Sequence, residues 1–283
     1  MTHVSDKWLA AGLSAPPVDR RPASTWSERT SRALLSLTRP LLRRLTRPRP
    51  IIAISRFVRD VYLAGGFPDD AIEVIRLGVP TKAFACSDRP VRAAGERLRL
   101  LFAGSLWEGK GPQAAVRAVG GLTRAGIPVH LDVVGSGTAN FMTWLDQIVT
   151  EEGVRDHVTF HGFVSPDEVR GFYQRGHVLV FPSQWDEPFA AVPVEAMAAG
   201  MAVVATTAGG TPEAITDGET GLLIPPGDAD ALATQIRRLF EDDDLRLRLG
   251  ASAARRAREA FEFDHYVDRL ESRYRLATQK PIH

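Results

Sequence analysis

A lysine in a glycine-rich turn is the first residue of this sequence whose surroundings could do chemistry. Residues 98–119 read LRLLFAGSLWEGKGPQAAVRAV, in which a strand-like run ends at Gly104 and a helix-compatible run follows Gly111. A P-loop, which cradles nucleotide phosphates, requires serine or threonine directly after its lysine to hold magnesium. Because Gly111 follows Lys110 here, we predict that the lysine serves another anion.

Two glutamates form the second candidate site. Glu187 and Glu195 are separated by seven residues in DEPFAAVPVEAMAAG, where Pro193 suits the first turn of a helix. Unpaired N–H groups at the start of such a helix attract a phosphate, and two carboxylates can accept hydrogen bonds from several sugar hydroxyls. This combination indicates a nucleotide-sugar pocket, although either glutamate alone is more commonly a helix-end charge or a solvated side chain. The N–H groups concerned are those of Ala190, Ala191 and Val192.

The other residue types that could do chemistry form no metal or redox motif. The single cysteine, Cys86, excludes a disulfide framework and a cysteine-rich metal site. Trp107 and Trp185 flank the lysine and glutamate loops, where packing and stacking on a base or sugar both stay open. Four histidines without ligand-like spacing are interpreted as core or strand-end residues: His130, His157, His161 and His177. We expect no metal and no cofactor.

A regular alternation of strands and helices from residue 98 onward would position these residues. Six apolar runs each precede a helix-compatible segment: LRLLFAG, VHLDVVG, HVTFHG, HVLVFPS, AVVATT and GLLIPPG. Runs without polar alternation indicate a parallel sheet covered on both faces, so we predict a doubly wound α/β domain. Closing helices are expected over residues 229–240, 245–261 and 264–277. Upstream, IIAIS, RFVRDVYLAGG and EVIRLGVP predict one strand–helix–strand unit that cannot bury its own sheet faces.

The composition fits a protein of about two domains. The chain has 283 residues, of which 44% are hydrophobic and 24% are charged, as in ordinary globular proteins. Nothing at the N-terminus resembles a signal peptide, and no apolar run approaches the ~20 residues of a membrane span. We therefore expect a cytoplasmic protein.

The net charge of +1 conceals a basic segment over residues 20–50. This segment holds nine arginines against one acid, Glu28, and its leucines recur at helical spacing opposite several arginines. A basic amphipathic helix can bind an anionic membrane surface, which would make the protein peripheral to the membrane. The alternative is a scaffold helix whose leucines face a core and which Pro40 kinks. Both interpretations stay open.

Taken together, residues 51–277 resemble the retaining glycosyltransferases of family 4, which have the two-domain GT-B fold. The most specific element is Glu187-x7-Glu195 with its Glu-Pro-Phe. It is joined in the family's order by GVP, GSLWEGKGP, VVGSG, VTFHGFV, FPS, GGTPE and DGETGLLIPPGD, and the opening VSDKWL also fits. Each motif alone is weak, but their shared order and spacing are specific.

The resemblance implies a donor site for a nucleotide-diphosphate sugar. Lys110 would bind the diphosphate and Glu187 would hold the transferred sugar, which makes these two the catalytic residues, and Glu195 would accept from the ribose hydroxyls. The backbone of Phe163 and Val164 would contact the base. Four further residues would present backbone to the sugar and phosphates: Phe189, Ala190, Ala191 and Val192.

The sequence departs from the family at three places. Ser105, at the donor site, stands where the family usually has an arginine that supplies a second cation for the diphosphate. Ala190 stands where the family prefers glycine. The family's first domain, with its glycine-rich loop and catalytic-site histidine, should precede VSDKWL, and His3 does not clearly match that histidine.

We therefore predict three parts in a GT-B-type α/β protein. A remnant of the acceptor-side domain with the basic arm would span residues 1–75, a nucleotide-sugar-binding domain residues 76–262, and a helix returning toward the first domain residues 263–283. The incomplete first part leads us to expect poor transfer without a partner chain or self-association.

The predicted function is transfer of a sugar from a nucleotide sugar to an unidentified sugar, lipid or other small acceptor. The resemblance implies retention of configuration by front-face substitution, with no covalent enzyme intermediate. The alternatives are a non-catalytic nucleotide-sugar-binding subunit and an inactive fragment that needs a partner. We expect no nucleic-acid partner.

Overall fold

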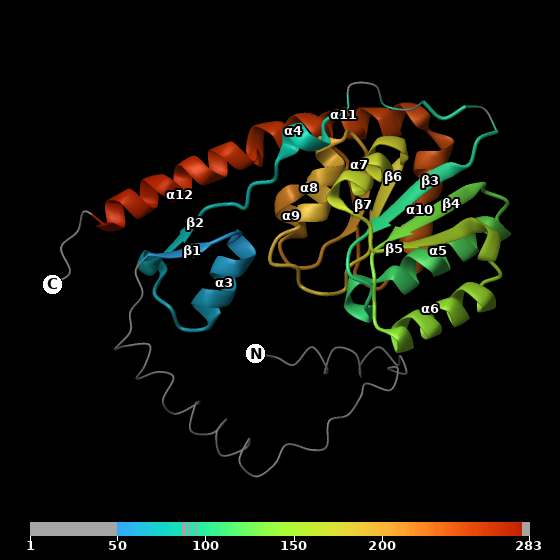
Figure 1. Ribbon diagram of the computed structural model, residues 1–283, viewed down its shortest axis with the longest axis horizontal. Coiled ribbons are helices and arrows are strands. Elements are labelled where there is room, and N and C mark those ends of the chain that lie inside the picture. The colour runs from blue at the N-terminus through green and yellow to red at the C-terminus, as the bar shows by residue number, and fades with distance from the viewer. Residues whose placement is uncertain (1–49, 87–88, 90, 94, 279–283) are drawn as a thin grey trace, which may run out of the picture. The chain divides into compact units, whose positions relative to one another are not determined.

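The computed structural model describes residues 50–86, 89, 91–93 and 95–278. The predicted basic segment and the start of the predicted first domain, up to residue 49, lie outside the described residues. The described part contains a six-stranded sheet and a two-stranded sheet (Figure 1).

All strand pairs of the larger sheet are parallel. Each of the six runs that the sequence predicted as a strand forms one. Because helices cover both faces, the strands need apolar side chains on both sides, which explains the lack of polar alternation. The strands are β3 (Leu98–Ala103), β4 (Val129–Val134), β5 (Val158–Gly162), β6 (Val178–Phe181), β7 (Ala202–Thr206) and β8 (Leu222–Ile224).

The spatial order of these strands is β5-β4-β3-β6-β7-β8. The chain enters at β3 in the middle, proceeds to the β5 edge, and then returns to β6 on the other side of β3. This order defines a doubly wound sheet of the dinucleotide-binding type. The predicted α/β class is therefore confirmed.

Helices cover the two faces of the sheet in two groups (Figure 1). On one face α5 contacts α6 and α10, and on the other α8 contacts α11 and α4. The helices of the described part are α3 (Arg56–Ala64), α4 (Thr81–Phe84), α5 (Pro112–Arg124), α6 (Ala139–Glu151), α7 (Pro166–Arg175), α8 (Ala191–Ala198), α9 (Thr211–Ala214), α10 (Ala229–Glu241), α11 (Asp243–Ala260) and α12 (Phe263–Thr278), with short 3-10 helices η1 (Asp69–Ala71), η2 (Glu108–Lys110) and η3 (Arg155–His157).

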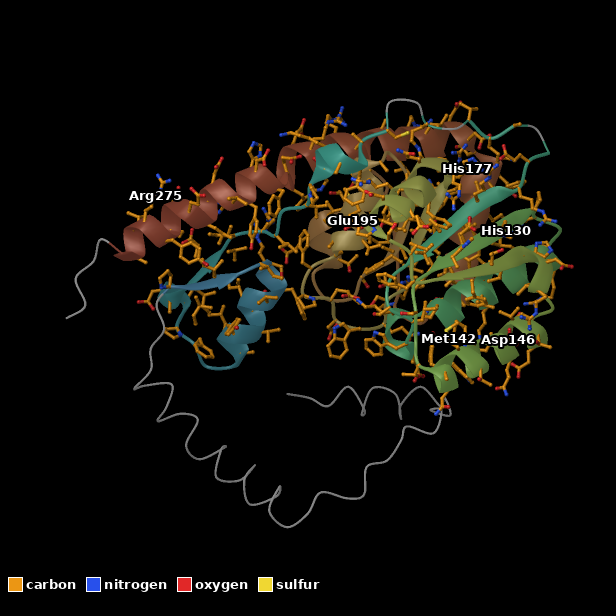
Figure 2. All side chains as sticks on the ribbon, in the orientation of Figure 1. His130, Met142, Asp146, His177, Glu195 and Arg275 are labelled. Atoms are coloured by element: carbon orange, nitrogen blue, oxygen red, sulfur yellow. The ribbon has the colours of Figure 1, made fainter. Side chains whose placement is uncertain are left out.

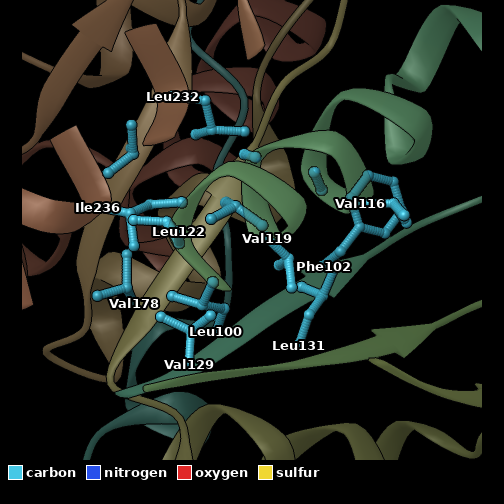
Figure 3. Packing of buried hydrophobic residues seen from close by; sticks show 14 of the residues in the cluster. Leu100, Phe102, Val116, Val119, Leu122, Val129, Leu131, Val178, Leu232 and Ile236 are labelled. Carbon is cyan, nitrogen blue, oxygen red and sulfur yellow. The ribbon is translucent and has the colours of Figure 1, made fainter. Parts of the chain in front are cut away.

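The core beneath α5 and α10 holds the lysine loop in place. Leu100 and Phe102 of β3 contact the inner face of α5, which presents Val116, Val119 and Leu122 at helical spacing (Figure 3). Each such side chain contributes about 1.5–3 kcal/mol when fully buried. β3 and α5 are thus fixed on both sides of the turn that carries the lysine.

The upstream segment forms the predicted strand–helix–strand unit. β1 (Ile51–Ala53) pairs in parallel with β2 (Ile72–Val74), and α3 connects them. α3 begins at Ser55, whose side chain accepts a hydrogen bond from the Val58 N–H at 3.0 Å. No residue of α3 is buried, as expected for a unit with one helix on a two-stranded sheet.

The segment between β2 and α4 is bound to the end of α11 and the start of α12. The Val79 N–H donates to the Phe261 carbonyl at 2.7 Å, and the buried Thr81 hydroxyl donates to the Glu262 carboxylate. Further along α12, Arg273 forms an ion pair with Glu73 of β2 at 2.6 Å. The last helix therefore contacts the upstream unit.

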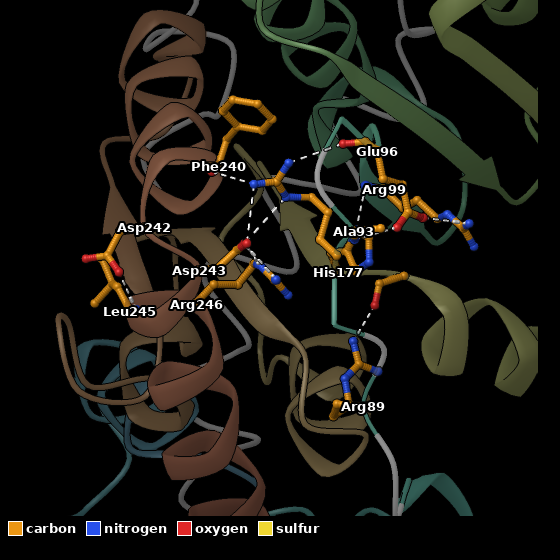
Figure 4. Close-up of polar contacts among 12 residues, drawn as sticks. Arg89, Ala93, Glu96, Arg99, His177, Phe240, Asp242, Asp243, Leu245 and Arg246 are labelled. Atoms are coloured by element: carbon orange, nitrogen blue, oxygen red, sulfur yellow. Dashed lines mark hydrogen bonds and ion pairs between the residues drawn. The ribbon is translucent and has the colours of Figure 1, made fainter.

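Charged side chains connect the start of α11 with the segment before β3. Buried Arg246 forms an ion pair with Asp243 at 2.8 Å (Figure 4). Asp243 also pairs with Arg92 at 3.3 Å. Since Arg246 is only 3% exposed, its charge requires this partner.

His177, at the start of β6, is a core residue as the sequence analysis proposed. Its side chain is buried, and Nδ1 accepts a hydrogen bond from the Arg99 N–H of β3 at 3.0 Å (Figures 2 and 4). Nδ1 must therefore be unprotonated, and Nε2, which carries the hydrogen, has no partner among the described residues. Burial lowers the pKa of His177 to about 4.

We expect His177 to weaken the fold in mild acid. In the unfolded chain its pKa is near 6.5, so between pH ~6.5 and 4 the unfolded state binds a proton that the folded state excludes. Stability is fully present above that window and should fall by about 1–3 kcal/mol as the pH drops through it. Urea unfolding at pH 7, 5.5 and 4.5 measures this loss. The variant His177→Asn, whose amide oxygen can still accept from the Arg99 N–H, should lose less unfolding free energy over the same pH range. Equal losses in both proteins would contradict the assignment of this pH dependence to His177.

Candidate functional site

The lysine and glutamate loops leave the sheet at the point where its strand order reverses. β3 and β6 are neighbours, but the chain proceeds from them toward opposite edges of the sheet. In open parallel sheets, ligands bind in the crevice outside the carboxyl ends of two such strands. Lys110 ends η2, which follows β3, and Glu187 lies in the loop after β6.

Lys110 and Glu187 form an ion pair, in which Nζ donates to Oε1 at 2.6 Å. The Ser183 hydroxyl donates to the same oxygen at 2.8 Å, and Thr206 holds Ser183 by donating to its carbonyl at 2.5 Å. Glu187 is only 5% exposed, so its charge needs a close cation. Its second oxygen, Oε2, has no hydrogen-bond partner among the described residues and is not sealed from solvent. One carboxylate oxygen is therefore structural, and the other can accept from a ligand.

The carbonyl group of Gly109 also connects η2 to the loop after β6. Gly109 O accepts hydrogen bonds from the N–H groups of Gln184 at 2.8 Å and Trp185 at 2.9 Å. The rings of Trp107 and Trp185 meet edge to face with centroids 5.6 Å apart. The Trp107 ring lies where a Cβ at Gly109 would be. The two tryptophans therefore pack the loops together, and both keep part of their ring surface accessible.

Gly111 lies between η2 and α5, as the cap residue of both, in a left-handed conformation with φ of 74°. A Cβ at this position would overlap the carbonyl oxygen of Pro182, in the loop after β6. Glycine is therefore required after the lysine for two physical reasons. One is the left-handed backbone conformation, and the other is the close approach of the loop after β6.

Gly111→Ala should lower the free energy of unfolding by more than about 2 kcal/mol. A left-handed L-residue alone costs about 1–2 kcal/mol, and the overlap with Pro182 adds to it. Gly126→Ala is a matched control, because Gly126 has φ of 73° and open space around its Cβ position. The difference in unfolding free energy between the two variants, measured with urea, gives the cost of the overlap with Pro182. Equal losses of stability would show that Pro182 moves aside at no measurable cost.

The helix after Glu187 begins at Ala191, so that Pro193 lies in its first turn as predicted from the sequence. The Ala191 N–H donates to the Phe189 carbonyl at 3.2 Å, so the prediction of an unpaired N–H at this residue is wrong. The cause is the conformation of Ala190, whose φ of −90° and ψ of 73° correspond to an inverse γ-turn. The N–H groups of Ala190 and Val192 have no acceptor among the described residues.

The residues around this turn present backbone rather than side chains. Phe189 is buried, and its ring packs against that of Phe261 with centroids 5.6 Å apart. Ala190 is also buried in the core cluster under α8. The methyl group that distinguishes it from glycine therefore packs inward.

Glu195 lies on α8 (Figure 2) and interacts with a residue that the sequence analysis did not single out. The Tyr173 hydroxyl donates to Glu195 Oε2 at 2.7 Å. Burial raises the pKa of the Glu195 carboxyl, and the hydrogen bond from Tyr173 opposes that shift. Glu195 forms no hydrogen bond or ion pair with Lys110 or Glu187. No local sequence pattern marks Tyr173, because its partner lies on another helix.

The remaining predicted site residues lie in the loops after β3 and β5. Ser105 is exposed and has no hydrogen-bond partner among the described residues. Phe163 is 82% exposed, and half-buried Val164 packs against the core cluster under α8. Since β5 is two strands from β3, the carboxyl ends of these two strands are about 10 Å apart. A ligand that reaches both must be as extended as a nucleotide.

The first turn of α3 is bound to the glutamate loop and to α9. The Ser55 hydroxyl donates to the Pro188 carbonyl at 2.5 Å. The Glu213 carboxylate accepts from the N–H groups of Arg56 at 3.0 Å and Phe57 at 2.8 Å, where the helix dipole favours an anion. The GGTPE motif by itself does not indicate this role for Glu213. Serine followed by an amphipathic run was a readable helix-start signal.

No group of three or more His, Cys, Asp or Glu side chains suited to a metal ion occurs among the described residues. None of the helices over residues 50–278 is long and apolar enough to cross a membrane.

Comparison with known proteins gives the family. The sequence family described as glycosyl transferases group 1 matches residues 87–256. The chain belongs to this family. The match covers both loops of the site and α8, and it confirms the predicted resemblance at this level, together with the GT-B-type α/β fold.

Individual relatives match the chain over part of their own length. The α-D-kanosaminyltransferase of Streptomyces kanamyceticus is 28% identical over 258 residues, which are 90% of this chain and 64% of that protein. The D-inositol 3-phosphate glycosyltransferase of Arthrobacter sp. (strain FB24) is 36% identical over 194 residues, which are 65% of this chain and 45% of that protein. The chain thus spans between 45% and 64% of the length of these relatives.

Among solved structures, the Anabaena protein HepE in complex with UDP superimposes with a TM-score of 0.73. It is 22% identical in sequence, and the match covers 80% of this chain and 63% of that one. This likeness shows the shared fold.

Proposed function

We propose that the site at the carboxyl ends of β3 and β6 binds a nucleotide-diphosphate sugar. We further propose that the chain transfers the sugar to an acceptor with retention of configuration, as family 4 enzymes do. The observation that carries this proposal is the Lys110–Glu187 pair at the switch point, 2.6 Å apart. Glu187 lies in the loop that leads into the N-terminus of α8. Membership of the glycosyl transferases group 1 family supports it, as does UDP in the HepE structure.

Lys110 can hold a diphosphate without releasing Glu187. An ammonium group has three N–H donors, and the ion pair with Glu187 occupies one of them. The other donors, with the unpaired N–H groups of Ala190 and Val192, would bind the phosphate oxygens. In this proposal these groups stabilise the departing charge without a metal or other cofactor.

Glu187 would bind the transferred sugar through Oε2. Its other oxygen is fixed by Lys110 and Ser183, so the carboxylate is oriented before the donor arrives. The bond between the anomeric carbon and the diphosphate oxygen breaks, and the acceptor hydroxyl attacks from the face that the diphosphate leaves. The acceptor proton passes to the departing phosphate oxygen, and no covalent enzyme intermediate forms.

A second candidate function, binding a nucleotide sugar without transferring it, is favoured by one observation. Ser105, where family 4 has an arginine, is exposed and supplies no charge, and Glu187 already balances the charge of Lys110. A site with so little net positive charge retains donors and acceptors for binding but stabilises a leaving diphosphate less.

Calorimetric titration of the full chain with UDP, GDP and ADP sugars tests binding. Release of free nucleotide in the presence of an acceptor panel then separates transfer from binding alone. D-inositol 3-phosphate belongs in that panel because the relative from Arthrobacter is named for it. The anomeric configuration of the product, read by NMR, tests retention. Absence of binding by every nucleotide sugar would overturn both candidate functions.

A further inference from the structure

Tyr173 connects α7 to the carboxylate of Glu195 on α8. Its hydroxyl donates to Oε2 at 2.7 Å, and the tyrosine itself is only 1% exposed. Tyr173 therefore cannot touch a bound ligand. Any effect it has on a ligand must pass through Glu195.

The tyrosine is itself held firmly. Its ring meets that of Phe84 edge to face, with centroids 5.5 Å apart. Its backbone carbonyl accepts a hydrogen bond from the Arg89 side chain at 2.7 Å. The hydroxyl is thus a fixed donor in the core cluster that also contains Val194 and Ala196 of α8.

The two oxygens of Glu195 have different surroundings. Oε2 is occupied by Tyr173, whereas Oε1 has no partner among the described residues and is not sealed from solvent. A largely buried carboxylate is costly unless hydrogen bonds compensate its charge. The tyrosine supplies such a bond at one oxygen and leaves the other as an accessible acceptor.

We infer that Tyr173 is a positioning residue that holds Glu195 with Oε1 directed at the ribose hydroxyls of a bound nucleotide. This inference rests on the proposed function. A ribose offers two adjacent hydroxyl donors, which suit a carboxylate oxygen of fixed direction.

The position of α7 also supports the inference that a nucleotide binds here. The helix begins at Ser165 with a complete capping box to Glu168, directly after the loop that contains Phe163 and Val164. Its other end carries Tyr173. One rigid helix of about 15 Å therefore positions both the loop proposed to contact the base and the carboxylate proposed to bind the ribose.

Tyr173→Phe tests the inference, because it removes one hydroxyl and keeps the ring. We expect calorimetry to show about tenfold weaker binding of whichever of UDP, GDP or ADP binds the wild type, as for loss of support to a charged acceptor. Binding of the matching 2′,3′-dideoxy nucleotide should change less than about twofold. Equal losses of affinity for the two ligands would mean that the hydroxyl only stabilises the fold, and this would overturn the inference. Unchanged affinity for both ligands would also overturn it.

The pH dependence supplies a second measurement. The hydrogen bond from Tyr173 lowers the pKa of Glu195, whose burial raises it. Ribonucleotide binding that needs the carboxylate is present above this pKa and lost as the pH falls through it. In Tyr173→Phe the pKa should rise further, so binding should be lost at a higher pH than in the wild type. An acid limb at the same pH in both proteins would contradict the proposed role.

Two controls make the result specific. Tyr266→Phe removes the hydroxyl of a half-buried tyrosine on α12 and should leave nucleotide binding unchanged. In a Glu195→Gln background, Tyr173→Phe should add little further loss, because coupled residues are not additive. Full additivity would show that Tyr173 acts independently of Glu195.

If Tyr173→Phe folds poorly, uniform 3-fluorotyrosine labelling of the wild type replaces it. Fluorine makes the phenol a stronger donor, so the acid limb of binding should move to lower pH. No movement would overturn the inference. Failure of the unlabelled wild type to bind any nucleotide would instead overturn the proposed function on which the inference rests.

Discussion

Lys110→Met is expected to weaken binding of a nucleoside diphosphate by about 10- to 100-fold, the range for loss of a hydrogen bond from a charged group. Binding of the parent nucleoside should change little, because the lysine lies at the diphosphate end of the proposed site. Methionine keeps most of the side-chain volume at this half-buried position. Titrations with a nucleoside and its mono- and diphosphates separate the contributions.

The same variant should also destabilise the fold. Without Lys110, the Glu187 carboxylate at 5% exposure keeps only Ser183 as a partner, and an unpaired buried charge costs about 3–5 kcal/mol. The double variant Lys110→Met with Glu187→Gln should recover most of that stability, because no buried charge remains. It should not recover diphosphate binding, which needs the cation.

The matched control is Lys82→Met, which removes an exposed lysine that pairs with Asp264 on the surface. Exposed pairs contribute little, so this variant should keep both its stability and its affinity for nucleotides. If Lys110→Met weakens nucleoside and diphosphate binding equally, the lysine shapes the turn and does not hold phosphate.

The sheet was predictable because its signal is local. Each of the six strands is an apolar run that must be buried on both faces, and burial on both faces removes the polar alternation that would signal an exposed sheet. The residues that follow these strands, including Lys110 and Glu187, must then gather at one edge of the sheet. The edge of the sheet that carries the site therefore followed from the parallel strands, whereas their spatial order is seen only in the structure.

The contacts within the site were not predictable from the sequence. Lys110 and Glu187 are 77 positions apart, and no local pattern shows that one already neutralises the other. The same holds for Ser55 with Pro188, 133 positions apart. The hydrogen bond of the Ala191 N–H, which the sequence did not predict, has a different cause. It depends on the backbone angles of Ala190, which an alanine side chain does not dictate.

Glu187→Gln is expected to separate sugar binding from nucleotide binding. The amide oxygen of glutamine can replace Oε1 and accept from both Lys110 and Ser183, so the unfolding temperature should change little. The amide NH2 then replaces Oε2, and a donor stands where the proposed site needs an acceptor for sugar hydroxyls. Affinity for the nucleotide sugar and the rate of transfer should fall by about 10- to 100-fold, as for loss of a charged acceptor.

Binding of the free nucleoside diphosphate should be preserved or improved in Glu187→Gln, because Lys110 loses its anionic partner and offers more net charge to the phosphates. The contrast between weaker nucleotide-sugar binding and preserved or stronger diphosphate binding is the informative result. A variant with a damaged site would bind both ligands less tightly. Glu108→Gln is the matched control. Glu108 is an acid of η2, and its carboxylate forms no hydrogen bond or ion pair with the described residues, so its removal changes local charge without touching Lys110. Parallel losses of diphosphate and nucleotide sugar in Glu187→Gln would assign this glutamate to the fold alone.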